Sequence, residues 1–149
     1  MNTPEKHIRI VLADDDEDDR ELFEMAVKEL TETAKVTLII NGDELLKYLD
    51  ENKKPDILFL DLNMPLKSGI ECLEIIRTND RFKKLPIIIL STSSAKRDID
   101  KCYELGANFY IVKPFSHTEL SSIIKKILDK NWNENFVSPP KNKFVYKGD

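Results

Sequence analysis

The chain has 149 residues, of which 41% are apolar and 34% charged, and its formal net charge is −4. This length supports one domain with its own core rather than two, and the acidic balance disfavours a non-specific nucleic-acid binder, which needs a clustered basic face. No apolar stretch is long enough to span a bilayer, and residues 1–9 lack the apolar core of a secretory signal, so we expect a cytoplasmic protein with no membrane partner.

Short β-rich runs alternate with longer segments of helical periodicity in the first half of the chain. The predicted strands are residues 8–13, 36–40 and 56–60, the last of these nearly all apolar. The first predicted helix covers residues 16–30, and a second follows a turn and cap at residues 41–43.

The second half continues the alternation. A helix is predicted after Gly69, a strand at 86–90, a helix that includes 99–105, and a strand at 109–112. Gly106 is suited to end the fourth helix, and Ser116 with Glu119 three residues later forms a capping box for the fifth. Five strands alternating with five helices indicate an α/β fold with a parallel sheet covered on both faces.

The composition changes after Lys130. Residues 131–149 contain a double proline and many polar residues, but also apolar ones such as Trp132 and Phe144. We therefore divide the chain into a domain at 1–130 and a C-terminal extension at 131–149, which is either disordered or docked on the domain or a partner. The two cysteines, Cys72 and Cys102, have no CxxC spacing and are expected to be buried thiols in a reducing compartment.

Polar residues follow the predicted strands at the points where they end. They are Asp14-Asp15-Asp16, Asp61 with Asn63, Ser91-Thr92, and Lys113-Pro114. Parallel strands end at one edge of the sheet, so converging carboxylates there would repel each other unless a cation lay among them. Mg²⁺ prefers such oxygen ligands, and a carboxylate beside a metal and a lysine can attack phosphorus. Each residue alone is more often a cap or turn residue, and only their joint placement points to chemistry.

These motifs resemble the receiver domain of bacterial two-component response regulators. The resemblance covers about residues 8–128 and is carried by ADDD at 13–16, FLDLNMP at 59–65, LST at 90–92 and YIVKPF at 110–115. It implies a flavodoxin-like (βα)5 fold, a five-stranded parallel sheet in the order 2-1-3-4-5 flanked by five helices.

The resemblance also implies roles for individual residues. Asp61 would be the phosphoacceptor. Asp14, Asp15, Asp61 and the backbone carbonyl of Asn63 would bind Mg²⁺. Lys113 and the hydroxyl of Ser91 would contact the phosphoryl group, Ser91 and Tyr110 would form the switch pair, and the Lys113-Pro114 bond would be cis.

The expected function is that of a stand-alone response regulator rather than an enzyme acting on other molecules. A sensor histidine kinase, of the phytochrome type, or a histidine phosphotransfer protein would donate the phosphoryl group. A downstream protein would bind the surface of the fourth helix, fifth strand and fifth helix. No DNA-binding domain is expected, and the extension could mediate a homodimer.

Two alternative functions stay open. One is a haloacid dehalogenase-type phosphatase, which usually has a second Asp where this chain has Asn63. The other is a degenerate receiver that only binds proteins.

Overall fold

The computed structural model describes residues 7–130, 132 and 139–147, and a five-stranded sheet lies at its centre. The strands are β1 (Ile8–Ala13), β2 (Ala34–Ile39), β3 (Ile57–Leu60), β4 (Ile87–Ser91) and β5 (Phe109–Val112). All neighbouring pairs are parallel, and the order is β2-β1-β3-β4-β5. The strand order implied by the family resemblance is therefore confirmed.

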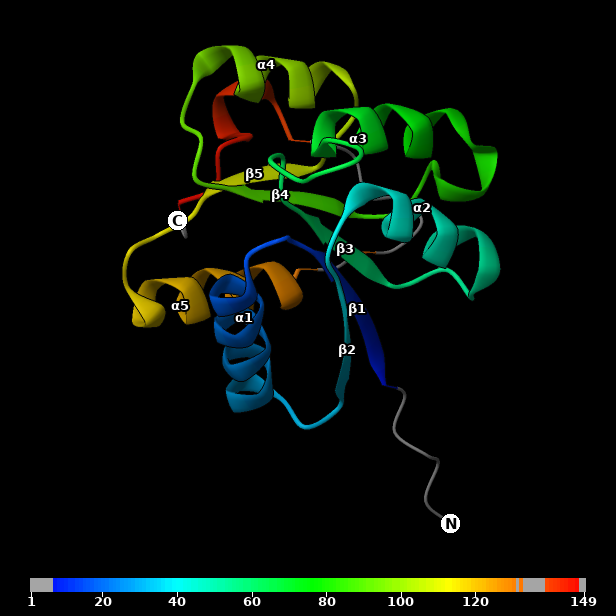
Figure 1. Cartoon of the computed structure of the whole chain (residues 1–149). Helices are drawn as coiled ribbons and strands as arrows, with labels where there is room; N and C mark the ends of the chain where they lie inside the picture. The colour runs from blue at the N-terminus through cyan, green and yellow to red at the C-terminus, as the bar shows by residue number, and fades with distance from the viewer. Residues whose placement is uncertain (1–6, 131, 133–138, 148–149) are drawn as a thin grey trace.

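Helices cover both faces of this sheet (Figure 1). They are α1 (Glu17–Leu30), α2 (Gly42–Glu51), α3 (Gly69–Thr78), α4 (Lys96–Glu104) and α5 (His117–Leu128). Helices α1 and α5 lie on one face, and α2, α3 and α4 lie on the other (Figure 1). Each face has its own apolar core, and every residue of β3 and β4 is buried, as expected for central parallel strands.

Side-chain caps fix where four of the helices begin. Asp16, Asn41, Ser68 and Ser116 each accept a hydrogen bond from the backbone N–H three residues further on. Helix α4 is different, because its N-cap residue Ala95 makes no side-chain cap bond. This missing signal explains why the sequence indicates only the later part of α4. Gly106 follows α4 with φ 95°, as suits a residue that ends a helix.

The predicted cis peptide bond is wrong. Lys113-Pro114 is trans, like every peptide bond in the described residues. The trans form is the more stable one for X–Pro bonds by about 0.5–1 kcal/mol, and the local sequence alone carries no signal strong enough to reverse it.

Part of the C-terminal extension packs against the edge of the sheet beyond β5. The N–H of Tyr110 donates to the carbonyl of Phe144 at 3.0 Å, and the N–H of Tyr146 donates to the carbonyl of Tyr110 at 2.8 Å. Val145 thereby forms a parallel bridge with Tyr110, after a short 3₁₀ helix, η2 (Lys141–Lys143). The rest of the extension, 131, 133–138 and 148–149, lies outside the described residues.

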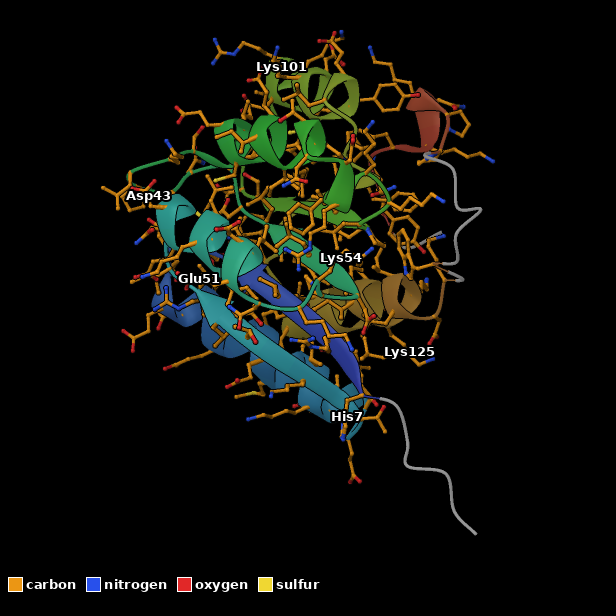
Figure 2. The ribbon with its side chains drawn as sticks, turned by 90° about the vertical axis from the view of Figure 1, so that its right-hand side faces the viewer. His7, Asp43, Glu51, Lys54, Lys101 and Lys125 are labelled. Carbon is orange, nitrogen blue, oxygen red and sulfur yellow. The ribbon has the colours of Figure 1, made fainter. Side chains whose placement is uncertain are left out.

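The two histidines of the chain lie at different places in the fold. Figure 2 shows His7, just before β1, at the lower end of that strand, and Asp43, in the first turn of α2, toward its other end. His7 thus lies at the amino end of the strands, and His117 contacts Glu29 of α1 at 3.4 Å.

Among the helices of the described residues, none combines the length and the apolar character needed to cross a membrane.

Candidate functional site

The carboxyl ends of β1 and β3 place Asp14 and Asp61 next to each other. The N–H of Asp61 donates to the carbonyl of Ala13 at 2.9 Å, which aligns the two strand ends. The residues Asp14 and Asp61 are 1% and 5% exposed, whereas Asp15 is exposed. One carboxylate oxygen from each of Asp14, Asp15 and Asp61 lies within 4.8 Å of the other two. The structure therefore brings together the three acidic residues that the sequence singled out.

Lys113, just after β5, reaches into this cluster. Its Nζ lies 2.8 Å from Asp14 Oδ2, 2.7 Å from Asp19 Oδ2 and 3.2 Å from Asp61 Oδ2. Burial opposes the charge of the ammonium group, but the hydrogen bonds to Asp14 and Asp19 outweigh it, so the pKa of Lys113 lies above its ordinary value. Lys113 is thus a fixed positive charge at the centre of the site.

One lysine does not balance this many carboxylates. Burial raises the pKa of Asp14 to about 6, although Lys113 and the N–H of Asp16 both stabilise its charged form. The N–H of Leu62 donates to Oδ1 of the Asp61 carboxylate at 2.7 Å, and the other oxygen, Oδ2, faces Lys113. A buried, negatively charged set of oxygens suits a hard divalent cation, and Asp14, Asp15 and Asp61 could hold one.

Ser91 and Tyr110 form a connected pair beside the cluster. Ser91, the last residue of β4, is fully buried, and its Oγ accepts from the N–H of Ser93 at 3.2 Å. Tyr110 is also fully buried, and its hydroxyl donates to the carbonyl of Ser93 at 2.7 Å. Burial raises the pKa of Tyr110, so its hydroxyl remains a hydrogen-bond donor. The ring of Tyr110, which the sequence analysis assigned to the switch pair with Ser91, thus lies inside the protein in this structure.

Two residues complete the comparison with the sequence prediction. Asn63 lies exposed in the loop two residues beyond Asp61. Asp19, which was not among the predicted site residues, makes the shortest of the three contacts to Lys113. Its position could have been inferred from the cap at Asp16, because a residue three positions after an N-cap lies on the first helical turn, next to the strand ends.

Comparison with known proteins gives the same picture. The sequence profile of the response regulator receiver domain matches residues 10–125. Chemotaxis protein CheY1 of Helicobacter pylori is 34% identical over 91 residues, which are 61% of this chain and 73% of that protein. Response regulator Rcp1 of Synechocystis sp. is 28% identical over 136 residues, which are 87% of this chain and 92% of Rcp1.

Solved structures of related proteins superpose well. The crystal structure of the phosphorylated cyanobacterial phytochrome response regulator RcpA is 32% identical, covers 89% of this chain and 99% of its own, and has a TM-score of 0.79. The Mn²⁺-bound form of Rcp1 is 28% identical, covers 88% and 98%, and has a TM-score of 0.74.

The fold, the site and these similarities show which class of protein this is. It is an α/β signalling domain that accepts a phosphoryl group at the carboxyl end of a parallel sheet. The chain belongs to the response regulator receiver domain family. This membership decides against the haloacid dehalogenase-type alternative.

Proposed function

We propose that Asp61 accepts a phosphoryl group from the phosphohistidine of a sensor histidine kinase or histidine phosphotransfer protein, in a magnesium-dependent reaction. The observation that carries this proposal is the position of the Asp61 carboxylate. It is 5% exposed, within reach of Asp14 and Asp15, and 3.2 Å from the Lys113 ammonium. The phosphorylated form of RcpA supports the same chemistry for this chain.

The residues of the acidic cluster fit a magnesium ion. Asp14, Asp15 and Asp61 would supply carboxylate oxygens, and Asn63 would supply its backbone carbonyl. When bound, Mg²⁺ neutralises charge on the phosphoryl oxygens. The Mn²⁺-bound form of Rcp1 supports a divalent cation here, because both chains have the same fold.

Asp61 would act as the nucleophile through a carboxylate oxygen, and attack by a carboxylate needs no general base. Its Oδ2 forms the new O–P bond while the N–P bond of the phosphohistidine breaks and the imidazole leaves with the electron pair. The N–H of Leu62 orients the carboxylate through Oδ1. Lys113 is close enough to Oδ2 to contact the phosphoryl oxygens once the group has been transferred.

The signal would leave the site through the turn after β4. The Ser91 Oγ now accepts from Ser93, and it would reorient to donate to a phosphoryl oxygen. The N–H of Ser93 would then lose its acceptor. Ser93 also links two other elements, because its carbonyl accepts from the Tyr110 hydroxyl and its own hydroxyl donates to Asp98 of α4 at 2.6 Å. A change at Ser91 would thereby reach both β5 and α4, so that phosphorylation shifts the population of two surface states.

The kinase partner is proposed from the similar proteins, and the downstream partner from the surface that the switch would change. A kinase of the phytochrome type is proposed, because Rcp1 and RcpA are similar over most of this chain and RcpA is a phytochrome response regulator. A downstream protein would bind at α4, β5 and α5. Residues 139–147 lie against β5 and would form part of that surface, or of a homodimer contact. We place this switch in the cytoplasm.

The test is intact-mass spectrometry after incubation with acetyl phosphate and Mg²⁺. Wild type is expected to gain one phosphoryl group, and to gain none when EDTA replaces Mg²⁺. Asp61→Asn is expected to gain none, while Asp50→Asn, the same change at an exposed position on α2, should behave as wild type. No gain in wild type would indicate the degenerate, binding-only receiver, and a gain in Asp61→Asn would mean that another carboxylate is the acceptor.

A further inference from the structure

Asp19 is the partner that the Lys113 ammonium contacts most closely. The Nζ–Oδ2 distance is 2.7 Å to Asp19, compared with 2.8 Å to Asp14 and 3.2 Å to Asp61. Asp19 belongs to α1, whereas Asp14 and Asp61 follow strands of the sheet. The lysine is thus held between the sheet and a helix, with its weakest contact to the proposed nucleophile.

Helix α1 holds Asp19 in a defined position. The N–H of Asp19 donates to its N-cap residue, Asp16, at 2.9 Å. The next residue, Arg20, donates from Nη1 to the carbonyl of Asp14 at 2.9 Å, which fixes the first turn of α1 to the end of β1. The Asp19 side chain is 36% exposed, so it is in contact with solvent while it reaches the largely buried Lys113.

A lysine ammonium and a divalent cation would compete for the carboxylates of Asp14 and Asp61. Lys113 contacts Oδ2 of both residues, so a cation that binds these carboxylates would weaken or replace part of that contact. The cost of this replacement depends on whether the ammonium has another anion to contact. Asp19 provides one that is not among the three clustered carboxylates.

We propose that Asp19 is a positioning residue that holds Lys113 at the α1 side of the site and so keeps the oxygens of Asp14 and Asp61 accessible to Mg²⁺. This inference rests on the proposed function, because it concerns the same site. Without Asp19, the Lys113 ammonium has only Asp14 and Asp61 as partners among its described contacts, and it competes more strongly with the metal.

The test is a double-mutant cycle read out by isothermal titration calorimetry with Mg²⁺. Asp19→Asn is expected to raise the Kd for Mg²⁺ by about three- to tenfold, which lies in the lower part of the range of coupling found between contacting residues. In the Lys113→Met background, the same Asp19→Asn change is expected to alter the Kd by less than about twofold. Asp18→Asn is the matched control, because it removes an exposed charge from the same helical turn.

A second readout separates positioning from a general loss of structure. Asp19→Asn should raise the Mg²⁺ concentration needed for half-maximal phosphorylation by acetyl phosphate in proportion to the Kd. A variant with a damaged fold would instead unfold at a lower urea concentration than wild type, which circular dichroism measures.

Two results would overturn the inference. Equal effects of Asp19→Asn with and without Lys113 would mean that Asp19 acts only through its charge, and an unchanged Kd in Asp19→Asn would mean that it does not influence metal access. Either result can occur while wild type still gains a phosphoryl group, so it differs from failure of the proposed function, which wild type itself would show.

Discussion

Four aspartates near Lys113 have the same side chain but different surroundings. Asp14 and Asp61 are buried at strand ends, Asp15 is exposed, and Asp19 lies partly exposed on α1. Burial makes a charge costly and therefore ties it to a partner, whereas an exposed carboxylate stays charged at little cost. The division of roles that we propose for nucleophile, metal ligands and positioning residue follows these surroundings.

The two cysteines allow a test of burial at single residues. Cys72 and Cys102 are both fully buried, and burial raises the pKa of the Cys72 thiol to about 11 and that of Cys102 to about 12. Since the thiolate is the reactive form, at most about one Cys72 thiol in a thousand is reactive at pH 8, compared with roughly a quarter for an ordinary thiol. We expect no iodoacetamide labelling of the native protein, measured by intact mass.

The denatured protein provides the control, because both thiols should be labelled at the same pH in guanidinium chloride. Rapid labelling of the native chain would show that one of the helices that carry the cysteines, α3 or α4, opens readily.

At the scale of elements, the C-terminal segment is joined to the sheet mainly through Phe144. This side chain is fully buried and contacts the rings of Tyr103 and Tyr110, with centroid distances of 5.1 and 6.2 Å. Lys141 adds an ion pair with Asp100 of α4 at 3.3 Å, but both side chains are partly exposed to solvent, so this pair contributes little.

Phe144→Ala is therefore expected to lower the free energy of unfolding by about 3–5 kcal/mol, the usual cost of removing a buried phenylalanine side chain. Urea denaturation followed by circular dichroism measures it. Phe115→Ala is the matched control, because Phe115 is fully exposed and its loss should change stability by no more than about 0.5 kcal/mol. Equal effects of the two changes would contradict the packing of Phe144 described above.

Local signals were enough to predict most elements of the fold. The apolar runs of β3 and β4 and the caps at Asn41 and Ser116 are readable in short windows of sequence. Helix α4 begins earlier than the sequence indicates. Its start could not be predicted because the N-cap residue, Ala95, has no capping side chain. Strand β2 likewise begins earlier, at Ala34, where pairing with Ile8 of β1 decides the boundary rather than local propensity.

Features of the site that depend on distant contacts were harder to predict. Lys113 and Asp19 are 94 positions apart, and only the folded sheet, with α1 beginning after the carboxyl end of β1, brings them together. Tyr110 contacts the segment around Phe144, whose sequence has no periodicity that would place it on β5. The strand-end rule identified which residues gather, but not how one lysine is shared among them.

At the scale of the whole molecule, folding itself creates the acidic cluster. Asp14, Asp15 and Asp61 are far apart in an unfolded chain, and the parallel sheet forces their oxygens to within 4.8 Å. Their repulsion opposes folding, and Lys113 offsets only part of it. A cation that binds this cluster binds the folded state and not the unfolded one, so it must raise the stability of the entire domain.

We therefore expect Mg²⁺ to raise the melting temperature. At ten times its Kd, a ligand specific for the folded state adds about 1.4 kcal/mol, which corresponds to roughly 3–6 °C for a domain of this size. Thermal denaturation followed by circular dichroism, with and without MgCl₂, measures the shift, and EDTA should reverse it.

Asp15→Asn separates metal binding from a general salt effect. Asp15 is exposed, so this change should not damage the core, and it removes both a proposed metal ligand and a source of repulsion. The variant should melt at or above the wild-type temperature without metal and should show little further increase with Mg²⁺. KCl of equal ionic strength is the second control, since screening alone acts on all surface charges. An equal Mg²⁺-induced increase in wild type and Asp15→Asn would show that the ion stabilises the fold from somewhere other than the acidic cluster.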